Sequence, residues 1–238
     1  MQLFYHEKTL ESTFDLDAEE SKHLIKVLRK GKGDKIQFTD GKGCLLKGSI
    51  IDANPKKARI QVEQRHYQPE DDFHIHLAIC PTKNLDRMEW MLEKITEIGV
   101  HEVTFIESKH SGRVFLKMDR LEKKVIAACK QSLKYHFPKI NGLKPLEEVL
   151  KEARFDAYQR FIAYIDEENT RHLFEKAEPN QSYIVLIGPE GDFSKEEIAM
   201  ALEYHFLPCS LGKARLRTET AGVAAVHSLQ LKNTLIIP

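Results

Sequence analysis

The stretch Tyr183-Ile184-Val185-Leu186-Ile187-Gly188-Pro189-Glu190-Gly191-Asp192-Phe193-Ser194 contains the change from strand to helix that decides the fold. Its apolar first half predicts a buried strand, and two glycines follow directly. Ser194 and Glu197, three residues apart, form a capping-box pattern that opens a helix. In open α/β sheets, ligands bind beyond the carboxyl ends of the strands, so this turn is a candidate ligand loop. The alternative is an ordinary tight turn.

A second turn of the same kind follows at Leu211-Gly212-Lys213-Ala214-Arg215-Leu216-Arg217-Thr218-Glu219-Thr220-Ala221. Thr218 is expected to cap the last helix, with Glu219 in the first turn and small residues at 221–225 that permit close packing. One βα unit joins the two turns, so we expect them to lie side by side and to share a pocket. The alternative is that the arginines are solvated or pair with surface carboxylates.

The rest of the C-terminal part alternates between strand-like and helix-like segments. Apolar residues at helical spacing from Leu85 to Ile98 predict a helix that Gly99 ends. Such alternation predicts an α/β fold, a mostly parallel sheet with helices on both faces. The expected strands are 73–80, 102–106, 160–165, 183–187 and 207–211, and the other expected helices are 118–134, 146–153, 194–204 and 218–232.

The N-terminal part is predicted to be rich in β structure, with one helix. Asp17 opens this helix, and Leu24, Val27 and Leu28 give it an apolar stripe. The polar, proline-containing segment 68–72 is expected to be a linker. Short strands near 35–39, 44–52 and 57–67, with a hairpin turn at 40–43, indicate a small barrel.

The composition excludes several classes of protein. Lys plus Arg total 36, as do Asp plus Glu, so the net charge is zero and a wholly basic nucleic-acid coating protein is excluded. No apolar run approaches the roughly 18 residues that span a bilayer, and the start has no secretion signal. We therefore expect a cytoplasmic protein with no membrane partner. Four scattered cysteines without a C-x-x-C pair are expected to be reduced thiols: Cys44, Cys80, Cys129 and Cys209.

No metal site is expected. His74 and His76 share one face of a strand, but no third ligand lies nearby in the sequence, which favours a structural role. Walker, G-x-G-x-x-G, H-E-x-x-H and G-x-S-x-G motifs are missing, which argues against NTPase, dinucleotide-binding, zincin and serine-hydrolase functions. A sugar-phosphate or nucleotide enzyme with an anion loop at Gly188 and Gly191 is disfavoured by Pro189 and by the lack of a following lysine.

Basic residues concentrate between Glu107 and Lys139, where nine lysines and arginines face three acidic residues. Basic groups neutralise phosphates, and the interleaved rings of His110, Phe115 and 135–137 could stack on unpaired bases. This one-sided excess favours a polyanion-binding surface. The alternative is a solvated helix face.

The two C-terminal turns resemble those of the RsmE family, the small-subunit (16S) ribosomal RNA uridine-N3 methyltransferases of the SPOUT superfamily. The matching motifs are Ile187-Gly188-Pro189-Glu190-Gly191-x-Phe193-Ser194-x-x-Glu197 and Leu211-Gly212-x-x-Arg215-Leu216-Arg217-Thr218-Glu219-Thr220-Ala221. Shorter matches extend the resemblance over nearly the whole chain: His23-Leu24-x-x-Val27-Leu28-Arg29, Lys83 with Arg87, Lys94-x-Thr96-Glu97-x-Gly99-Val100 and Gln131-Ser132. The chain departs from the family at Asp192, usually a second Gly, and at Leu133-Lys134, often Gly-Arg.

The resemblance implies a two-domain enzyme. Residues 1–70 would be a PUA-like β-barrel that binds RNA, and residues 73–238 an α/β methyltransferase domain with a trefoil knot. It further implies a homodimer that acts on ribosomal RNA within the small subunit, with S-adenosylmethionine as cofactor and no metal. The cofactor would lie against Leu186, Ile187, Gly188, Pro189, Glu190, Gly191, Leu211, Gly212, Arg215, Leu216 and Thr218.

Methylation at N3 of uracil requires removal of a proton, because N3 is protonated at neutral pH. Glu190 and Glu219 are candidate proton acceptors, and Arg217, with Arg215 second, could stabilise the developing uracil anion. The target base would be splayed out of the RNA. The expected RNA contacts are Arg29, Lys83, Arg87, Lys109, Arg113, Lys130, Gln131 and Lys134.

Two other functions remain open from the sequence. A knotted methyltransferase could act on another position of ribosomal RNA or on transfer RNA. The second alternative is a non-catalytic RNA-binding protein. Asp192 adds a negative charge to the predicted cofactor loop, which could disable cofactor binding. Binding of S-adenosylmethionine would separate an enzyme from a binding protein.

Overall fold

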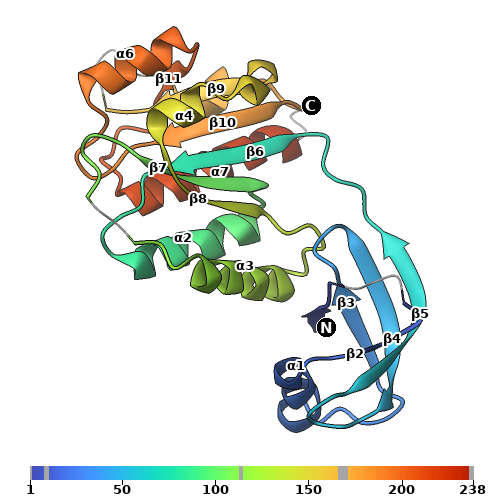
Figure 1. Cartoon of the computed structure of the whole chain (residues 1–238). Helices are drawn as coiled ribbons and strands as arrows, with labels where there is room; N and C mark the ends of the chain where they lie inside the picture. The colour runs from blue at the N-terminus through green and yellow to red at the C-terminus, as the bar shows by residue number, and fades with distance from the viewer. Residues whose placement is uncertain (1, 8–10, 113–114, 166–170, 236–238) are drawn as a thin grey trace. The chain divides into compact units, whose positions relative to one another are not determined.

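The computed structural model of this chain describes residues 2–7, 11–112, 115–165 and 171–235 (Figure 1). Its contacts divide the chain into two compact units. Unit 1 comprises Met1–Glu70 with Ile126–Phe137, and unit 2 comprises Asp71–Val125 with Pro138–Pro238. Each unit has its own sheet, so the predicted α/β class with two parts is confirmed. No helix within the described residues is both long and apolar enough to cross a membrane.

Unit 1 is built on a five-stranded, curled sheet in the order β1-β3-β4-β5-β2. Strand β1 runs parallel to β3, and the other pairs are antiparallel. The rings of Phe4, Phe14 and Phe38 pack on one another in its core, with ring centroids 5.1–5.5 Å apart. The strands are β1 (Leu3–Tyr5), β2 (Thr13–Asp15), β3 (Lys35–Thr39), β4 (Cys44–Asp52) and β5 (Arg59–Tyr67).

The helical segment of unit 1 is shorter than the sequence predicts. Asp17 caps α1 (Ala18–Lys22) by accepting a hydrogen bond from the Glu20 amide, as predicted. The chain then continues as a π-helix over His23–Val27. This wider turn breaks the 3.6-residue period, so Leu24 is buried but Val27 is 63% exposed. The predicted role of Val27 in the apolar stripe is therefore wrong.

A segment from the second half of the chain completes unit 1. It contains the end of α3 (Met118–Ser132) and the turn that follows. The Gly43 amide donates to the Tyr135 carbonyl at 2.9 Å, and the Phe137 amide donates to the Gly41 carbonyl at 2.8 Å. The Phe137 ring packs on Tyr5 with ring centroids 5.1 Å apart. These bonds join the turn to the predicted hairpin at 40–43.

Unit 2 contains a six-stranded sheet in the order β11-β9-β10-β6-β7-β8, and every neighbouring pair is parallel. This confirms the predicted parallel sheet. Strand β8 was not predicted. The trefoil knot stays a prediction. The strands are β6 (His74–Ile79), β7 (Glu102–Glu107), β8 (Lys139–Pro145), β9 (Gln159–Ala163), β10 (Ser182–Ile187) and β11 (Leu207–Cys209).

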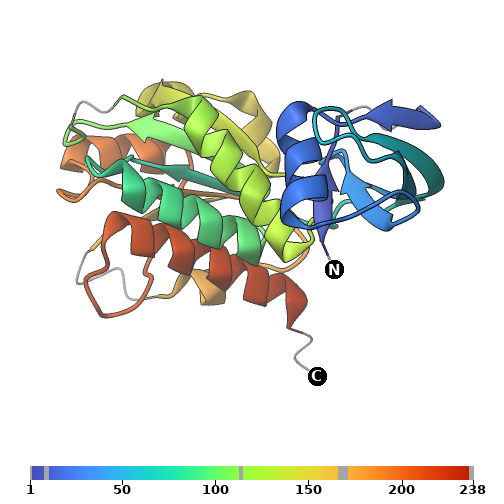
Figure 2. The ribbon, with the colours of Figure 1, turned by 90° about the horizontal axis from the view of Figure 1, so that it is seen from below.

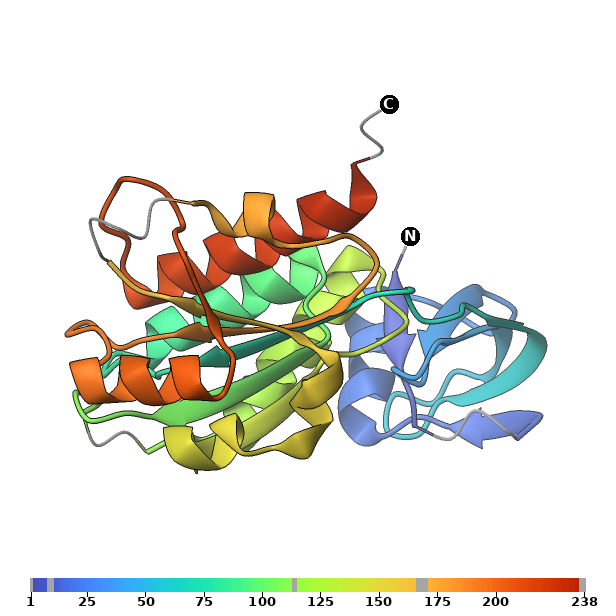
Figure 3. The same cartoon turned by 90° about the horizontal axis from the view of Figure 1, so that it is seen from above.

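Helices cover both faces of this sheet, with α2 (Leu85–Ile98) and α7 (Thr218–Thr234) on one face (Figures 2 and 3). On the other face lie α4 (Leu146–Leu150), a 3-10 turn over Ala153–Ala157, and α6 (Lys195–Glu203). A Cβ atom at Gly222 would lie 2.9 Å from the Met91 sulfur and 3.0 Å from Ile79. The small residues at the start of α7 therefore permit close packing, as predicted. A short helix, α5 (Leu173–Lys176), contacts α7.

A buried charged cluster lies where the central strands of unit 2 begin. Glu102 accepts two hydrogen bonds from Arg154, at 2.9 and 3.1 Å, and one from Asn141 at 2.7 Å. His76 lies opposite Glu102 and is bonded through Nε2 to the Thr104 hydroxyl at 2.8 Å. Burial lowers the pKa of His76 to about 3, so the ring is neutral near pH 7. This supports the structural interpretation of His76.

Candidate functional site

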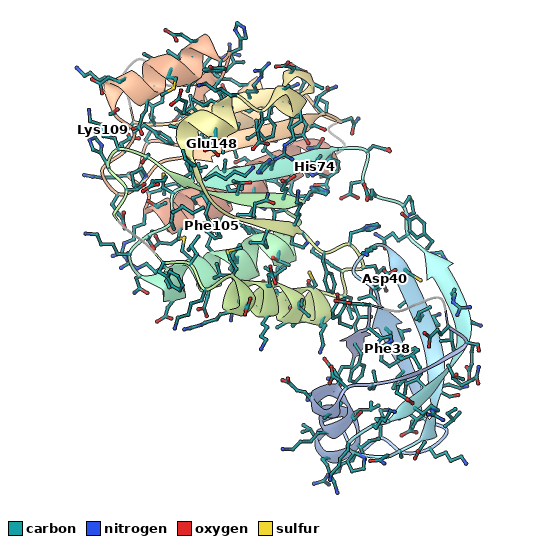
Figure 4. The ribbon with its side chains drawn as sticks, viewed as in Figure 1. Phe38, Asp40, His74, Phe105, Lys109 and Glu148 are labelled. Atoms are coloured by element: carbon teal, nitrogen blue, oxygen red, sulfur yellow. The ribbon has the colours of Figure 1, made fainter. Side chains whose placement is uncertain are left out.

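The loops that follow the strands of unit 2 all lie at one end of the sheet, because the strands are parallel. In Figure 4, Lys109 lies at this carboxyl end and His74 at the opposite end. Strand β9 lies between β10 and β11 and pairs with both. The strands β10 and β11 are therefore not adjacent, contrary to the expectation from the sequence, but the loops after both lie at the same end of the sheet.

The loop after β10 is a tight turn with a buried start and an exposed tip. Gly188 and Pro189 are buried, whereas Glu190 and Gly191 are exposed. A Cβ atom at Gly188 would lie 3.2 Å from the ring of Phe193, so a side chain there would push on this ring. The turn closes with a hydrogen bond of 3.0 Å from the Asp192 amide to the Pro189 carbonyl.

Asp192 ties three loops together. One carboxylate oxygen accepts from the Phe193 amide at 2.8 Å, and the other accepts from the Ile165 amide, after β9, at 3.1 Å. The Asp192 carbonyl accepts from Nδ1 of His110, after β7, at 3.0 Å. The φ of Asp192 is +63°, a left-handed value that Gly adopts freely and Asp tolerates because its side chain can bond locally. At this position, where the family usually has Gly, the Asp side chain adds a bridge between loops.

Replacing Asp192 with alanine should destabilise this end of the sheet by about 2 kcal/mol. Alanine removes both carboxylate bonds and has no local bond to offset the left-handed φ. Differential scanning calorimetry would measure the loss. The matched control is Asp192→Asn, which keeps the left-handed tolerance and one acceptor oxygen, so it should lose less than half as much. Equal stability of all three proteins would contradict the bridging role.

Glu197 makes a second connection between loops. Its Oε2 accepts from the Ser194 amide at 2.8 Å, and the Ser194 hydroxyl accepts from the Glu197 amide, so the predicted capping box is confirmed. Glu197 is buried, and its Oε1 accepts a hydrogen bond from the Lys109 amide at 2.7 Å. One carboxylate therefore starts α6 and holds the loop after β7 in place.

The loop after β11 and the start of α7 line a pocket together with α2. Gly212 has a φ of +116°, and no other atom lies within 4 Å of where its Cβ would be. A cofactor pocket shared by this loop and the loop after β10 stays a prediction. The pocket with α2 holds about 620 Å³ and is lined by Asp86, Arg87, Trp90, Arg215, Leu216, Arg217, Glu219 and Thr220.

Glu219 is the buried acidic group of this pocket, with only 6% of its surface exposed. Its Oε1 lies 3.7 Å from Nε of Arg87, and its Oε2 has no hydrogen-bond partner within the described residues. A buried carboxylate oxygen without a partner is costly unless a ligand or solvent satisfies it. The residues that line the pocket therefore combine this buried carboxylate with three arginines, Arg87, Arg215 and Arg217.

The structure changes two details of the predicted site. Thr218 is the first helical residue of α7, and the N-cap is Arg217, which makes no side-chain capping bond, so the predicted cap is wrong. Trp90 and Asp86 line the pocket but were not predicted. A sequence signal was available, because Trp90 lies off the apolar stripe of α2. In the structure it is accordingly 46% exposed. A large aromatic ring on the polar face of a helix is an indicator of binding.

The basic segment is less one-sided in space than in sequence. Acidic side chains from outside the segment pair with many of its lysines and arginines. The excess of positive charge in the sequence is therefore no longer an argument for a polyanion-binding surface. Among the predicted RNA contacts, Lys109 pairs with Glu196 at 3.2 Å and Lys130 with Glu20 at 2.5 Å. Further pairs are Arg120 with Asp86 and Glu89, Lys124 with Glu93, and Lys139 with Glu102.

The other predicted RNA contacts are placed as follows. Arg29, Lys83 and Gln131 are exposed, and Lys134 is half-buried. Arg87 lines the pocket, and Arg113 lies outside the described residues. The aromatic residues 135–137 are not available as a group, because His136 and Phe137 pack within unit 1 on Tyr67 and Tyr5.

Comparisons with known proteins match both parts of the chain. The family described as an RNA methyltransferase domain matches residues 69–230, and that described as an RNA methyltransferase PUA domain matches residues 16–63. Ribosomal RNA small subunit methyltransferase E of Buchnera aphidicola (from Acyrthosiphon pisum) is 30% identical over 221 residues, which cover 90% of this chain and 86% of that protein.

Two solved structures share nearly the whole fold. A probable rRNA-methyltransferase from Porphyromonas gingivalis is 42% identical, with a TM-score of 0.90 over 97% of this chain and 98% of that one. A ribosomal RNA small subunit methyltransferase E from Neisseria gonorrhoeae, bound to S-adenosyl methionine, is 26% identical, with a TM-score of 0.88 over 98% of both chains.

The fold and these matches define an RNA methyltransferase that carries a PUA domain. Within that class, the chain belongs to the family of ribosomal RNA small subunit methyltransferase E, as the sequence motifs predict. The family assignment covers both units.

Proposed function

We propose that this protein transfers a methyl group from S-adenosylmethionine to N3 of a uridine in small-subunit (16S) ribosomal RNA. The observation that carries the proposal is the buried carboxylate of Glu219, which has one oxygen without a partner and lies in a pocket with three arginines. This arrangement can accept a proton and stabilise a developing anion in one place. N3 methylation of uracil needs both.

The residues at the carboxyl end of the sheet fit the cofactor. Gly191 and Gly212 leave main-chain groups accessible on the two predicted cofactor loops, since no atom lies closer than 3.4 Å to where their Cβ atoms would be. Hydrogen bonds of Asp192 and Glu197 hold the loop after β10 in place. Because this loop is already ordered, it loses little conformational entropy when the cofactor binds. When bound, S-adenosylmethionine supplies an electrophilic methyl group on a sulfonium. The predicted contacts at 186–191, 211, 212, 215, 216 and 218 are retained in this proposal.

The proton acceptor for the uracil base would be Glu219 rather than Glu190. Glu219 is buried beside Arg87, whereas Glu190 is exposed at the tip of its loop. The Glu219 carboxylate would take the N3 proton as the N3 lone pair bonds to the methyl carbon and the sulfur–carbon bond breaks. The Arg217 guanidinium, with Arg215 second, would hold the negative charge that spreads onto the uracil oxygens.

Binding of the RNA would use both units. Residues 1–70 would act as the PUA-like RNA-binding domain and residues 73–238 as the methyltransferase domain, in a homodimer that works in the cytoplasm on RNA of the small subunit. The predicted contacts Arg29, Lys83, Arg113, Gln131 and Lys134 would face phosphates. Lys109 and Lys130 could contribute only by exchanging a carboxylate partner for a phosphate.

Mass spectrometry of nucleosides tests the proposal directly. The purified protein, S-adenosylmethionine and small-subunit RNA should yield 3-methyluridine. Glu219→Gln should slow its formation by about 10²–10³-fold. The matched control is Glu203→Gln, an exposed carboxylate at the end of α6 with no role in the proposal, which should stay within a fewfold of wild type. A different methylated nucleoside, or modified transfer RNA, would overturn the choice of target. Binding of RNA without binding of S-adenosylmethionine would overturn the enzymatic function.

A further inference from the structure

The pocket between α2 and the loop after β11 contains an aromatic ring that the reaction chemistry above does not use. Trp90 is the only tryptophan of the chain, and 46% of its surface is exposed. It lies in the second turn of α2, between the buried residues Met88 and Met91. An exposed indole at a pocket offers an aromatic face on which a flat ligand can stack.

The polar groups of the pocket are arranged for a uracil rather than for a general anion. Uracil presents an acceptor, a donor and an acceptor in sequence, O4, N3–H and O2. Glu219 is a buried carboxylate among the lining residues, its Oε1 lies 3.7 Å from Nε of Arg87, and Arg217 lines the same pocket as a further donor. Cytosine would place the N3 lone pair against the carboxylate, which disfavours it.

The charges of the pocket suit a nucleotide that is part of an RNA chain. Arg215 and Arg217 are exposed, and neither guanidinium makes a hydrogen bond or ion pair within the described residues. Asp86 would repel a phosphate, but Arg120 pairs with it at 3.1 Å. The volume of about 620 Å³ is ordinary for a small-molecule site.

From these features we propose that the pocket receives the target uracil, with its face stacked on Trp90 and its N3 edge read by Glu219 and the adjacent arginines. Trp90 is then a specificity residue of the active site. The inference rests on the proposed function and deepens it by naming the base-binding site. Leu216 and Arg215 belong both to this pocket and to the predicted cofactor loop, so the base and the methyl donor would share one wall.

The single tryptophan permits a direct binding test. The wild-type protein, saturated with S-adenosylhomocysteine, is titrated with uridine monophosphate and with cytidine monophosphate while tryptophan fluorescence is recorded. The two probes have the same charge and differ in the base edge. Uridine monophosphate should quench saturably at concentrations about tenfold lower than cytidine monophosphate. In Glu219→Gln, the amide can donate to cytosine N3, so this preference should fall to about twofold or less.

Steady-state methylation of small-subunit RNA tests the stacking. Trp90→Ala should raise KM for RNA about tenfold, and Trp90→Phe should restore most of it, because either ring can stack on the base. Calorimetric binding of S-adenosylmethionine should be unchanged in both variants. Partial exposure of Trp90 makes both variants compatible with folding, which thermal unfolding would verify.

The outcomes separate this inference from the proposed function. Active wild-type enzyme with an unchanged KM in Trp90→Ala, or with equal quenching by both nucleotides, would overturn the base pocket and leave the methyltransferase intact. Selective quenching by the uridine nucleotide without formation of 3-methyluridine would support the pocket and overturn the reaction. A Trp90→Ala protein that turns monomeric in sedimentation, with no quenching in the wild type, would assign this surface to a second copy of the chain.

Discussion

Replacing Arg217 with alanine should lower the single-turnover rate of uridine methylation by about 10²–10³-fold. Arg217 lines the same pocket as Glu219, and its guanidinium makes no hydrogen bond or ion pair within the described residues. In the proposed mechanism, this guanidinium would hold the charge that develops on the uracil oxygens. Because the side chain makes no structural bond, the melting temperature should stay within about a degree or two of wild type.

Arg215→Ala is the matched control, since it removes the same charge two residues away from the same exposed loop. Its effect should be smaller, on the order of tenfold or less, and should appear mainly in KM. Arg217→Lys separates charge from shape, because an ammonium keeps the charge but loses the planar fork. A single-turnover rate in Arg217→Ala within twofold of wild type would remove Arg217 from the mechanism.

Replacing Arg154 with alanine should destabilise unit 2 by about 2 kcal/mol. Glu102 is buried and would lose two of its hydrogen bonds, keeping Asn141 and the more distant Lys139. Removing one partner of a buried ion pair leaves the other charge buried and unpaired, which costs roughly 3–5 kcal/mol when both groups are buried. The partial exposure of Arg154 places the expected loss below that range. The free energy of unfolding from urea titrations measures this loss.

The control is Lys151→Ala, which removes an ion pair with Glu147 on the exposed side of α4. Surface pairs of this type contribute a few tenths of a kcal/mol. A loss in Arg154→Ala no larger than in Lys151→Ala would show that the Glu102 cluster contributes no more to stability than a solvated pair.

The same cluster predicts a loss of stability in acid. Burial alone raises the pKa of Glu102, but the Arg154 hydrogen bonds and its other partners lower it to about 2. Glu102 therefore contributes stability above pH 4.5, its unfolded value, and loses it as the pH falls towards 2. The unfolded chain also protonates His76 below pH 6.5, whereas the folded chain resists this down to about pH 3. Urea titrations between pH 7 and 3 should thus show steadily falling stability, less steeply in His76→Asn.

Segments with strong local signals could be predicted from the sequence. The apolar run of β10, the capping box at Ser194 and the glycine that ends α2 each act through neighbours in the chain. Strand β8 was missed because its sequence, KINGLKP, contains Gly and Pro and has few apolar residues, and it lies at an edge where only β7 pairs with it. The strands β1 and β2 have three residues each, too few for a pattern.

Those parts of the site that come from one continuous stretch of sequence could be predicted. Motifs identified Arg217 and Glu219, but their wall partner Trp90 comes from α2, more than a hundred residues earlier. Spacing could not show that β9 inserts between β10 and β11, because that depends on the strand order of the whole sheet. The charge of the basic segment was misjudged for the same reason. Its carboxylate partners, such as Glu20 and Glu93, are distant in sequence.

The hydrogen bonds of Tyr135 and Phe137 to the turn at 41–43 have a consequence for biosynthesis. Unit 1 begins at the N-terminus, yet its last contributing residue is Phe137. During translation, this unit cannot finish folding when residue 70 leaves the ribosome, and its hairpin must wait for the later segment to emerge. A fragment cut at the segment 68–72 would therefore lack part of its own fold, so dissection of the enzyme requires grafting residues 126–137 back onto the amino-terminal piece.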